Sequence, residues 1–229
     1  MWVHNVAILA TALRVYAVDI AGDVGKSEGR RPSTEREYVS WLSEMLDGLG
    51  LERVGLCGAS FGAWLASAYA RHFPRRISEI ALLAPPNLGP LRSAFIFRAA
   101  LATVLPGEGR VRKFYRYISS PQAPVPPEWA LRDFVIRWQC QRHSPPPPPL
   151  MTEEELRQLP KDTLMLLGND EVLYGVSNVL PRIRACAPHI VVEFLARAGH
   201  TISVDRADEV SARLLKFFGS SRPDIAVEP

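Results

Sequence analysis

Residues 53–73 read RVGLCGASFGAWLASAYARHF, and this stretch decides the fold. The run from Arg53 to Cys57 predicts a buried strand, and the apolar, alanine-rich run from Phe61 to Phe73, closed by Pro74, predicts a helix. The turn between them reads G-x-S-x-G with Ser60 at its centre. A serine on a sharp turn between strand and helix exposes its hydroxyl above the end of a sheet, so Ser60 is the candidate nucleophile.

Glycines lie two residues before and two residues after this serine, at Gly58 and Gly62. We expect close approach of strand and helix to require both, so that alanine at either position would crowd the turn. The same pattern also occurs in ordinary glycine-rich turns. Its place between a predicted strand and a predicted helix favours the nucleophile.

Strands and helices alternate along most of the chain. A helix capped by Ser33 or Thr34 is predicted up to Leu49, and another from Val210 to Phe218. Continuous apolar strands separated by helices indicate an α/β fold with a mostly parallel sheet covered by helices on both faces. The further predicted strands are Val15–Asp19, Ile80–Ala84, Thr163–Leu167 and Ile190–Leu195.

The segment 87–161 interrupts this alternation with three helix-like pieces and the proline run Pro145–Pro149. The run is either a stiff connector or a ligand for a polyproline-binding module, and the connector is favoured. We therefore divide the chain into a first core part, 1–86, a helical insertion, 87–161, and a second core part, 162–229. The insertion carries the aromatic residues Phe95, Phe97, Phe114, Tyr115, Trp129 and Trp138.

His200 is the candidate base. It follows the last predicted strand in Ala198-Gly199-His200 and precedes the final helix, which places it at the same sheet edge as Ser60. The alternative is a partly exposed loop histidine without a catalytic role. The other four histidines, including His72 at the end of the helix after Ser60, lack such a position.

Two adjacent carboxylates, Asp170 and Glu171, follow the strand that ends at Leu167, and one of them is expected to orient His200. At this point the sequence resembles the α/β-hydrolase family, whose acid loop after the seventh strand usually reads Gly, two variable residues, then the acid. Counted from Gly168, that spacing implies Glu171. The order serine, acid, histidine also matches the family.

The resemblance covers nearly the whole chain. Residues 14–27 look like the family's fourth strand and its loop, residues 84–86 like the exit of the sixth strand, and the insertion lies at the position of the family's lid. The backbone N–H of Phe61 is then one oxyanion donor. The family's first three strands and a second oxyanion donor are not found, so we expect an N-terminally truncated sheet with a gap beside the fourth strand, and a true start upstream of Met1.

Composition excludes several other classes. A net charge of +3 with scattered arginines gives no support for nucleic-acid binding, and the basic cluster Arg110, Arg112, Lys113 and Arg116 is expected to be a solvated helix face. No apolar run is long enough to span a membrane, and no signal peptide is found. Cys57, Cys140 and Cys186 form no metal or disulfide motif, which favours a cytoplasmic location.

The sequence thus predicts a cofactor-free and metal-free serine hydrolase with Ser60, Glu171 and His200 as its triad, acting on a small hydrophobic ester or related acyl substrate. The alternative is a non-catalytic remnant or small-molecule binding protein that keeps the triad pattern.

Overall fold

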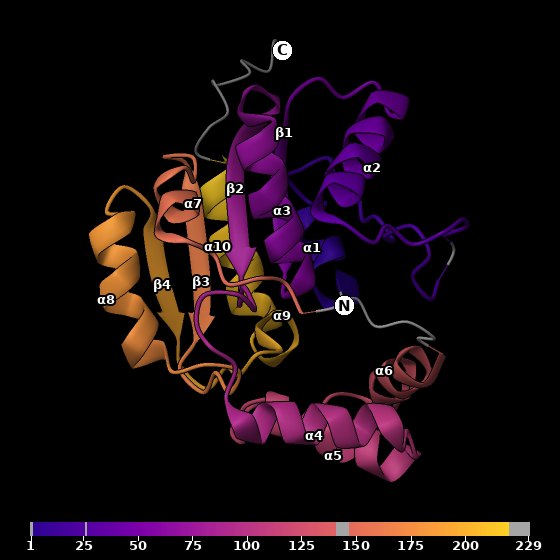
Figure 1. The fold of residues 1–229 in the computed structure, drawn as a ribbon. Coiled ribbons are helices and arrows are strands. Elements are labelled where there is room, and N and C mark those ends of the chain that lie inside the picture. The colour runs from indigo at the N-terminus through magenta and orange to yellow at the C-terminus, as the bar shows by residue number, and fades with distance from the viewer. Residues whose placement is uncertain (1, 26, 141–146, 220–229) are drawn as a thin grey trace.

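Four parallel strands form the central sheet, in the order β1-β2-β3-β4 (Figure 1). The computed structural model describes residues 2–25, 27–140 and 147–219. Leu56 of β1 pairs with Ile80 of β2, and Leu82 of β2 pairs with Met165 of β3. The strands are β1 (Val54–Ala59), β2 (Ile77–Leu83), β3 (Thr163–Gly168) and β4 (Val191–Leu195).

Helices cover both faces of the sheet, because alternate strand side chains point to opposite faces and both sets are apolar. Ile80 and Leu82 face one side, and Ala81 and Leu83 face the other; all four are fully buried. The first face packs against α2 (Glu35–Gly48), α3 (Phe61–His72), α7 (Glu153–Arg157) and α8 (Val176–Cys186). The second packs against α1 (Val6–Leu9), α9 (Ile202–Asp205) and α10 (Ala207–Gly219).

Thr34, one of the two predicted caps, begins α2. Its hydroxyl accepts the Glu37 N–H at 3.2 Å while the Glu37 carboxylate accepts the Thr34 N–H, which is a capping box. Tyr38 and Leu42, one helical turn apart, are then buried against α3.

Three helices form a separate layer beyond the carboxyl ends of the strands (Figure 1). They are α4 (Ser93–Val104), α5 (Glu108–Ile118) and α6 (Glu128–Cys140). Their own small core contains Ala102, Phe114 and Ile118. The predicted helix-like pieces of the insertion are therefore present. Pro145 and Pro146 of the predicted connector lie outside the described residues.

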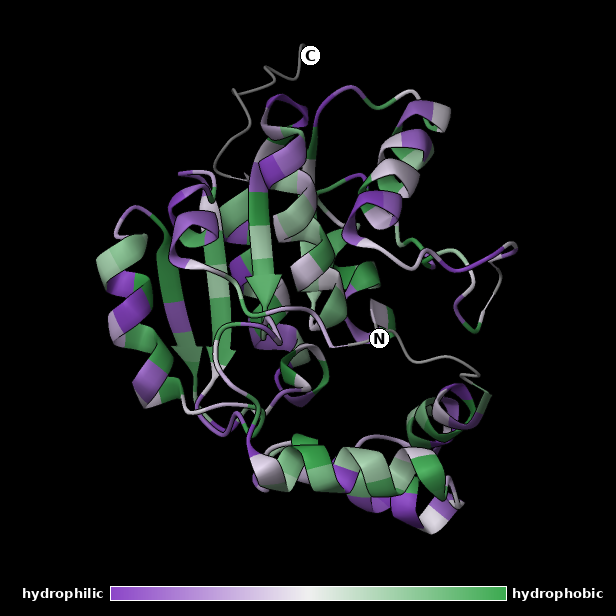
Figure 2. Cartoon of the chain, viewed as in Figure 1, coloured by the Kyte–Doolittle hydropathy of each residue, from purple (hydrophilic) through white to green (hydrophobic). Residues whose placement is uncertain are grey.

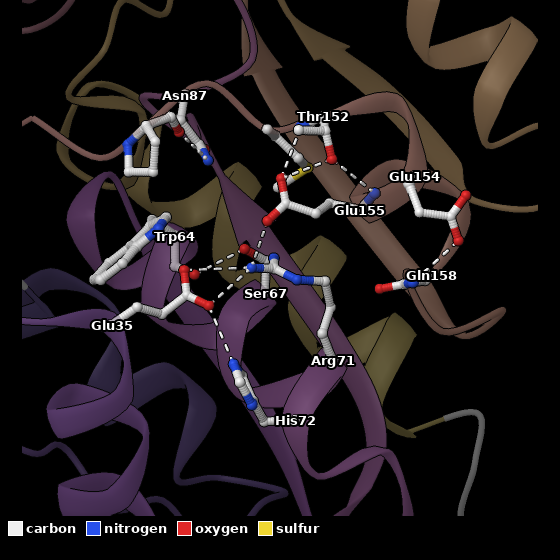
Figure 3. A network of polar contacts seen from close by, with 12 residues as sticks. Glu35, Trp64, Ser67, Arg71, His72, Asn87, Thr152, Glu154, Glu155 and Gln158 are labelled. Carbon is white, nitrogen blue, oxygen red and sulfur yellow. Dashed lines mark hydrogen bonds and ion pairs between the residues drawn. The ribbon is translucent and has the colours of Figure 1, made fainter.

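Arg71 anchors the chain where it returns from the insertion to the sheet (Figure 3). Its guanidinium lies 2.9 Å from a carboxylate oxygen of Glu155 in α7 and 3.3 Å from one of Glu35 in α2, and the Arg71 side chain is only 8% exposed. A largely buried arginine with two carboxylate partners ties three helices together. His72 lies at the surface, 3.2 Å from Glu35.

Two predictions for the N-terminal region, the strand Val15–Asp19 and the gap beside it, were wrong. Residues 14–20 form no strand, and the described residues before them form a 3-10 turn, Trp2–His4, and α1. A β-branched run becomes a strand only where its backbone finds a ladder partner, and residues 14–20 have none in the described chain. The sheet of the described residues consequently has no internal gap, and β1 and β4 are its edge strands.

In the part of the chain that the structure describes, every helix is too short or too polar to span a bilayer.

Candidate active site

Ser60 lies on the turn between β1 and α3 in a strained backbone conformation, with φ 50° and ψ −119°. Positive φ is unfavourable for a residue with a Cβ and persists only where the surroundings enforce it. A Cβ at Gly58 would lie 2.0 Å from the carbonyl oxygen of Gly62 and 2.6 Å from the amide nitrogen of Ala63, so the turn closes only with glycine at this position.

The prediction that Gly62 is equally restricted was wrong. A Cβ at Gly62 would meet nothing within 4 Å, because this residue lies on the open side of the first turn of α3. Only the glycine before the serine, Gly58, is required by close approach.

His200 and Ser60 meet although 140 residues separate them. Ser60 Oγ lies 2.7 Å from His200 Nε2, within hydrogen-bond distance. His200 follows β4 and Ser60 follows β1, so the carboxyl ends of two parallel strands bring them to one sheet edge. The His200 side chain is 9% exposed. A proton can pass directly between these two groups.

Of the two candidate acids, Glu171 contacts the histidine. His200 Nδ1 lies 2.8 Å from Glu171 Oε2, and Glu171 Oε1 accepts the Leu173 N–H at 2.8 Å. Burial alone would raise the pKa of Glu171, but the charge and hydrogen bond of His200, with the N–H groups of Leu173 and Val172, hold this pKa below its usual value. The fully buried carboxylate therefore stays ionised beside the imidazole.

Asp170 points elsewhere: its Oδ2 accepts a hydrogen bond from the Ser120 hydroxyl at 2.5 Å. Its backbone N–H donates to the Ala198 carbonyl at 2.9 Å, which ties the acid loop to the loop that carries His200. Asp170 thus links the acid loop to Ser120, which follows the insertion helix α5.

Asp205, which the sequence analysis did not identify, stabilises the loop of His200 through hydrogen bonds. Its Oδ2 accepts the N–H of Gly199 at 2.8 Å and that of Ser120 at 2.9 Å, and its Oδ1 accepts the Thr201 hydroxyl at 2.8 Å. Burial raises the pKa of Asp205, and these three hydrogen bonds oppose the rise. The only sequence signal is an acid within the apolar run Ile202–Asp205, which is too common to identify such a role.

The end of α5 rests directly on this loop. The His200 N–H donates to the Ile118 carbonyl at 2.7 Å, and the hydroxyls of Ser119 and Thr201 lie 2.8 Å apart. A Cβ at Gly199 would lie within 3 Å of backbone atoms of Ile118 and Ser120, so the two segments are in backbone contact. The position of α5 is consequently coupled to that of the histidine.

The backbone N–H of Phe61, the predicted oxyanion donor, is the first of α3, and the helix has no side-chain cap. This N–H has no hydrogen-bond acceptor among the described residues. Donors at a helix N-terminus carry partial positive charge, so they favour a negatively charged oxygen.

A cavity of about 600 Å³ lies beside the acid loop, between the end of α5 and the start of α8. Arg92, Arg116, Asn169 and Asp170 are among its lining residues. Glu171 also lines it, whereas Ser60 and His200 do not. Within the described ranges, no group of three or more His, Cys, Asp or Glu side chains could hold a metal ion.

Comparison with known proteins identifies the family. A model of the alpha/beta hydrolase family matches residues 1–213. The "uncharacterized carboxylesterase nap" of Bacillus subtilis (strain 168) is 31% identical, over 96% of this chain and 75% of that protein. Carboxylesterase YbfK of the same organism is 26% identical, over 95% and 75% of the two chains.

Solved structures agree with the sequence relatives. The crystal structure of naproxen esterase (carboxylesterase NP) from Bacillus subtilis superposes with a TM-score of 0.83 at 31% identity, covering 95% of this chain and 78% of that one. The predicted parallel sheet flanked by helices is confirmed. By sequence and by structure, this chain belongs to the α/β-hydrolase family.

Proposed function

We propose that this protein is a cofactor-free serine hydrolase that cleaves carboxylic esters with Ser60, His200 and Glu171. The observation that carries the proposal is the continuous hydrogen-bonded chain from Ser60 Oγ through the His200 imidazole to the buried Glu171 carboxylate, at 2.7 and 2.8 Å. The carboxylesterase relatives, similar over nearly the whole chain, support the same reaction class.

In the proposed reaction, His200 Nε2 removes the proton of Ser60 as Oγ attacks the ester carbonyl. The negative charge that develops on the carbonyl oxygen is stabilised by the free N–H of Phe61. His200 then protonates the departing alcohol, and the ester C–O bond breaks to leave an acyl group on Ser60.

Water hydrolyses the acyl-enzyme in the second half of the reaction. His200 removes a proton from water, the resulting hydroxide attacks the acyl carbon, and Ser60 recovers its proton as the carboxylic acid leaves. Glu171 keeps Nδ1 of His200 protonated, so that Nε2 is the free acceptor, and stabilises the imidazolium that forms in each half.

We propose a small hydrophobic acyl ester as substrate. Helices α4 to α6 lie beyond the carboxyl ends of the strands (Figure 1), and Ser60 and His200 meet at that edge of the sheet. The apolar side chains of these helices are therefore the proposed cover of the substrate. Phe114 and Trp138 pack inside the insertion with their rings 4.8 Å apart, whereas Phe97 and Trp129 remain exposed.

A serine-directed fluorophosphonate tests the proposal. We expect one equivalent of label on Ser60, located by peptide mass spectrometry, and none in Ser60→Ala. With p-nitrophenyl acyl esters of increasing chain length, Ser60→Ala should lower kcat by roughly 10⁴-fold or more. Ser67→Ala is the matched control, since this hydroxyl is buried and bonded to the Trp64 carbonyl.

A folded chain that neither labels nor hydrolyses esters would refute the proposal and favour a non-catalytic binding protein. Hydrolysis that survives Ser60→Ala unchanged would refute the assigned nucleophile.

A further inference from the structure

Helix α4 exposes a continuous apolar surface, which we call the α4 stripe. It consists of Ile96, Phe97, Leu101, Val104 and Leu105, whose exposed fractions are 51, 68, 40, 76 and 48%. Their spacing follows one side of the helix. The opposite side, with Phe95, Ala99 and Ala102, packs inside the insertion, so the α4 stripe faces away from the insertion's core. In Figure 2 this helix is mostly green and lies at the margin of the molecule.

Exposure on this scale is unusual for a folded protein, where large apolar side chains on the surface are normally scattered singly. No other helix in the described part of the chain exposes as many. The stripe is therefore a candidate interaction surface rather than an ordinary solvated face.

The charged side chains around the stripe are mostly basic. Between residues 92 and 116 the sequence has six basic side chains and a single acid, Glu108. Arg112 pairs with Glu108 and Glu128. The remaining five form no ion pair with any described residue: Arg92, Arg98, Arg110, Lys113 and Arg116.

Two contacts place part of this charge beside the stripe. The Arg98 guanidinium of α4 lies 4.4 Å from the centre of the Tyr117 ring of α5, and the Arg110 guanidinium of α5 lies 3.4 Å from the Leu105 carbonyl. Because Arg110 and Tyr117 are two turns apart on one side of α5, that side runs along α4. Lys113 lies between them on the same side.

We propose that the α4 stripe and the flanking basic row, Arg98, Arg110 and Lys113, dock onto the surface of an anionic phospholipid bilayer. An apolar helix side bordered by unpaired cations is the arrangement with which a helix lies in the plane of a membrane interface. Phe97 and Val104 reach the acyl chains, and the basic row contacts the lipid phosphates.

A bilayer fits this surface better than a protein partner does. The charges are unpaired and spread along a helix, and the apolar side chains stand on a convex helix, so no pocket selects a particular shape. Fluid acyl chains need no matching shape, and a negatively charged surface complements the row as a whole. The proposal does not depend on the chemistry of Ser60.

Co-sedimentation with vesicles tests it. The full chain and its Ser60→Ala form should both sediment with vesicles of phosphatidylcholine containing phosphatidylglycerol, less with phosphatidylcholine alone, and less at high salt. Neutralising Arg110 and Lys113 to Gln should weaken binding roughly fivefold per charge. Phe97→Ser with Val104→Ser should weaken it on the order of tenfold or more.

Matched controls lie elsewhere on the surface. Val125→Ser removes an apolar side chain that is 83% exposed, and Arg184→Gln removes an exposed charge of α8; both should bind as the unaltered chain does. Circular dichroism checks that each variant is folded.

Three results would overturn the proposal. The first is no binding to vesicles, or binding that changes neither with lipid charge nor with the substitutions in the stripe. The second is self-association in sedimentation that Phe97→Ser abolishes, which would make a second copy the occupant. The third is a change confined to the KM for soluble long-chain esters, which would assign the stripe to the substrate.

Discussion

The sheet-bearing core and the helical insertion differ in how completely they bury their apolar side chains. In the core, Ile80, Leu82 and Met165 are fully buried between two layers of helices. Helices α4 to α6 of the insertion bury fewer large apolar side chains, among them Val111, Phe114 and Leu131, and leave one side of α4 exposed. Since each buried aliphatic side chain contributes roughly 2 kcal/mol, stability comes mainly from the core. The packed core can therefore enforce the strained φ of Ser60.

The two regions are joined where α5 ends on the loop of His200. Hydrogen bonds from His200 to Ile118 and from Ser120 to Asp205 cross this joint. The catalytic base proposed for the reaction, His200, is therefore held partly by a hydrogen bond to the insertion.

The largest effect is expected in the core, at Gly58→Ala. Its new Cβ would lie 2.0 Å from a backbone oxygen, so strand and helix must separate, and we expect a loss of more than about 3 kcal/mol in the free energy of unfolding, with loss of activity. Gly62→Ala is the control, since the Cβ has open space there and alanine favours helix by about 0.5–1 kcal/mol. Denaturant unfolding compares them, and equal destabilisation would contradict the close approach at Gly58 alone.

Glu171→Gln should lower kcat by roughly 10³- to 10⁴-fold, because the neutral side chain no longer fixes the tautomer of His200. Asp170→Asn is the matched variant and should lower it far less, since Asp170 bonds to Ser120 instead. Steady-state kinetics with one ester substrate compares them. The reverse order of effects would make Asp170 the acid.

The same Glu171→Gln variant should also change how the free energy of unfolding depends on pH. A carboxyl whose pKa is lower in the folded state stabilises the fold above its unfolded pKa of about 4.5, and this contribution is lost as the pH falls through the lowered value. The difference in unfolding free energy between the unaltered chain and Glu171→Gln should therefore shrink below about pH 4.5. A difference that grows on acidification would show a raised pKa instead.

Asp205→Ala removes the side chain that joins the loop of His200 to the end of α5, and it should have an intermediate effect on kcat. It leaves the buried N–H groups of Gly199 and Ser120 without an acceptor, which costs about 3 kcal/mol of stability. Displacement of His200 should lower kcat roughly 10- to 100-fold with little change in KM. Asp205→Asn should recover part of kcat through its one remaining acceptor oxygen. The exposed Asp208→Asn is the control, and an unchanged kcat in Asp205→Ala would rule out a positioning role.

Features of the fold and the site that depend on local patterns could be predicted from the sequence, and those that depend on tertiary contacts could not. Apolar runs in the sequence predict the strands β1 to β4. Ser60 and His200 each follow such a run, so their approach at one sheet edge also follows from local patterns. Val15–Asp19 has a similar pattern but no ladder partner, which no local pattern reveals. The hydrogen bonds of Asp205 reach segments 85 and 6 residues away, and the open space at Gly62 depends on tertiary packing, so neither follows from a local sequence pattern.

The smallest effect on the core is expected from Phe114→Ala. Phe114 is 4% exposed and packs between Phe95 and Trp138, so its loss opens a cavity that destabilises the insertion by roughly 3 kcal/mol locally. If the insertion opens as a unit of its own, limited proteolysis within residues 93–140 should accelerate while the unfolding free energy of the sheet changes by less than about 1 kcal/mol. Leu82→Ala, at a fully buried position of β2, should instead lower that free energy by about 2–5 kcal/mol. Equal global losses in the two variants would show that core and insertion unfold together, and the histidine would then rest on a single cooperative unit.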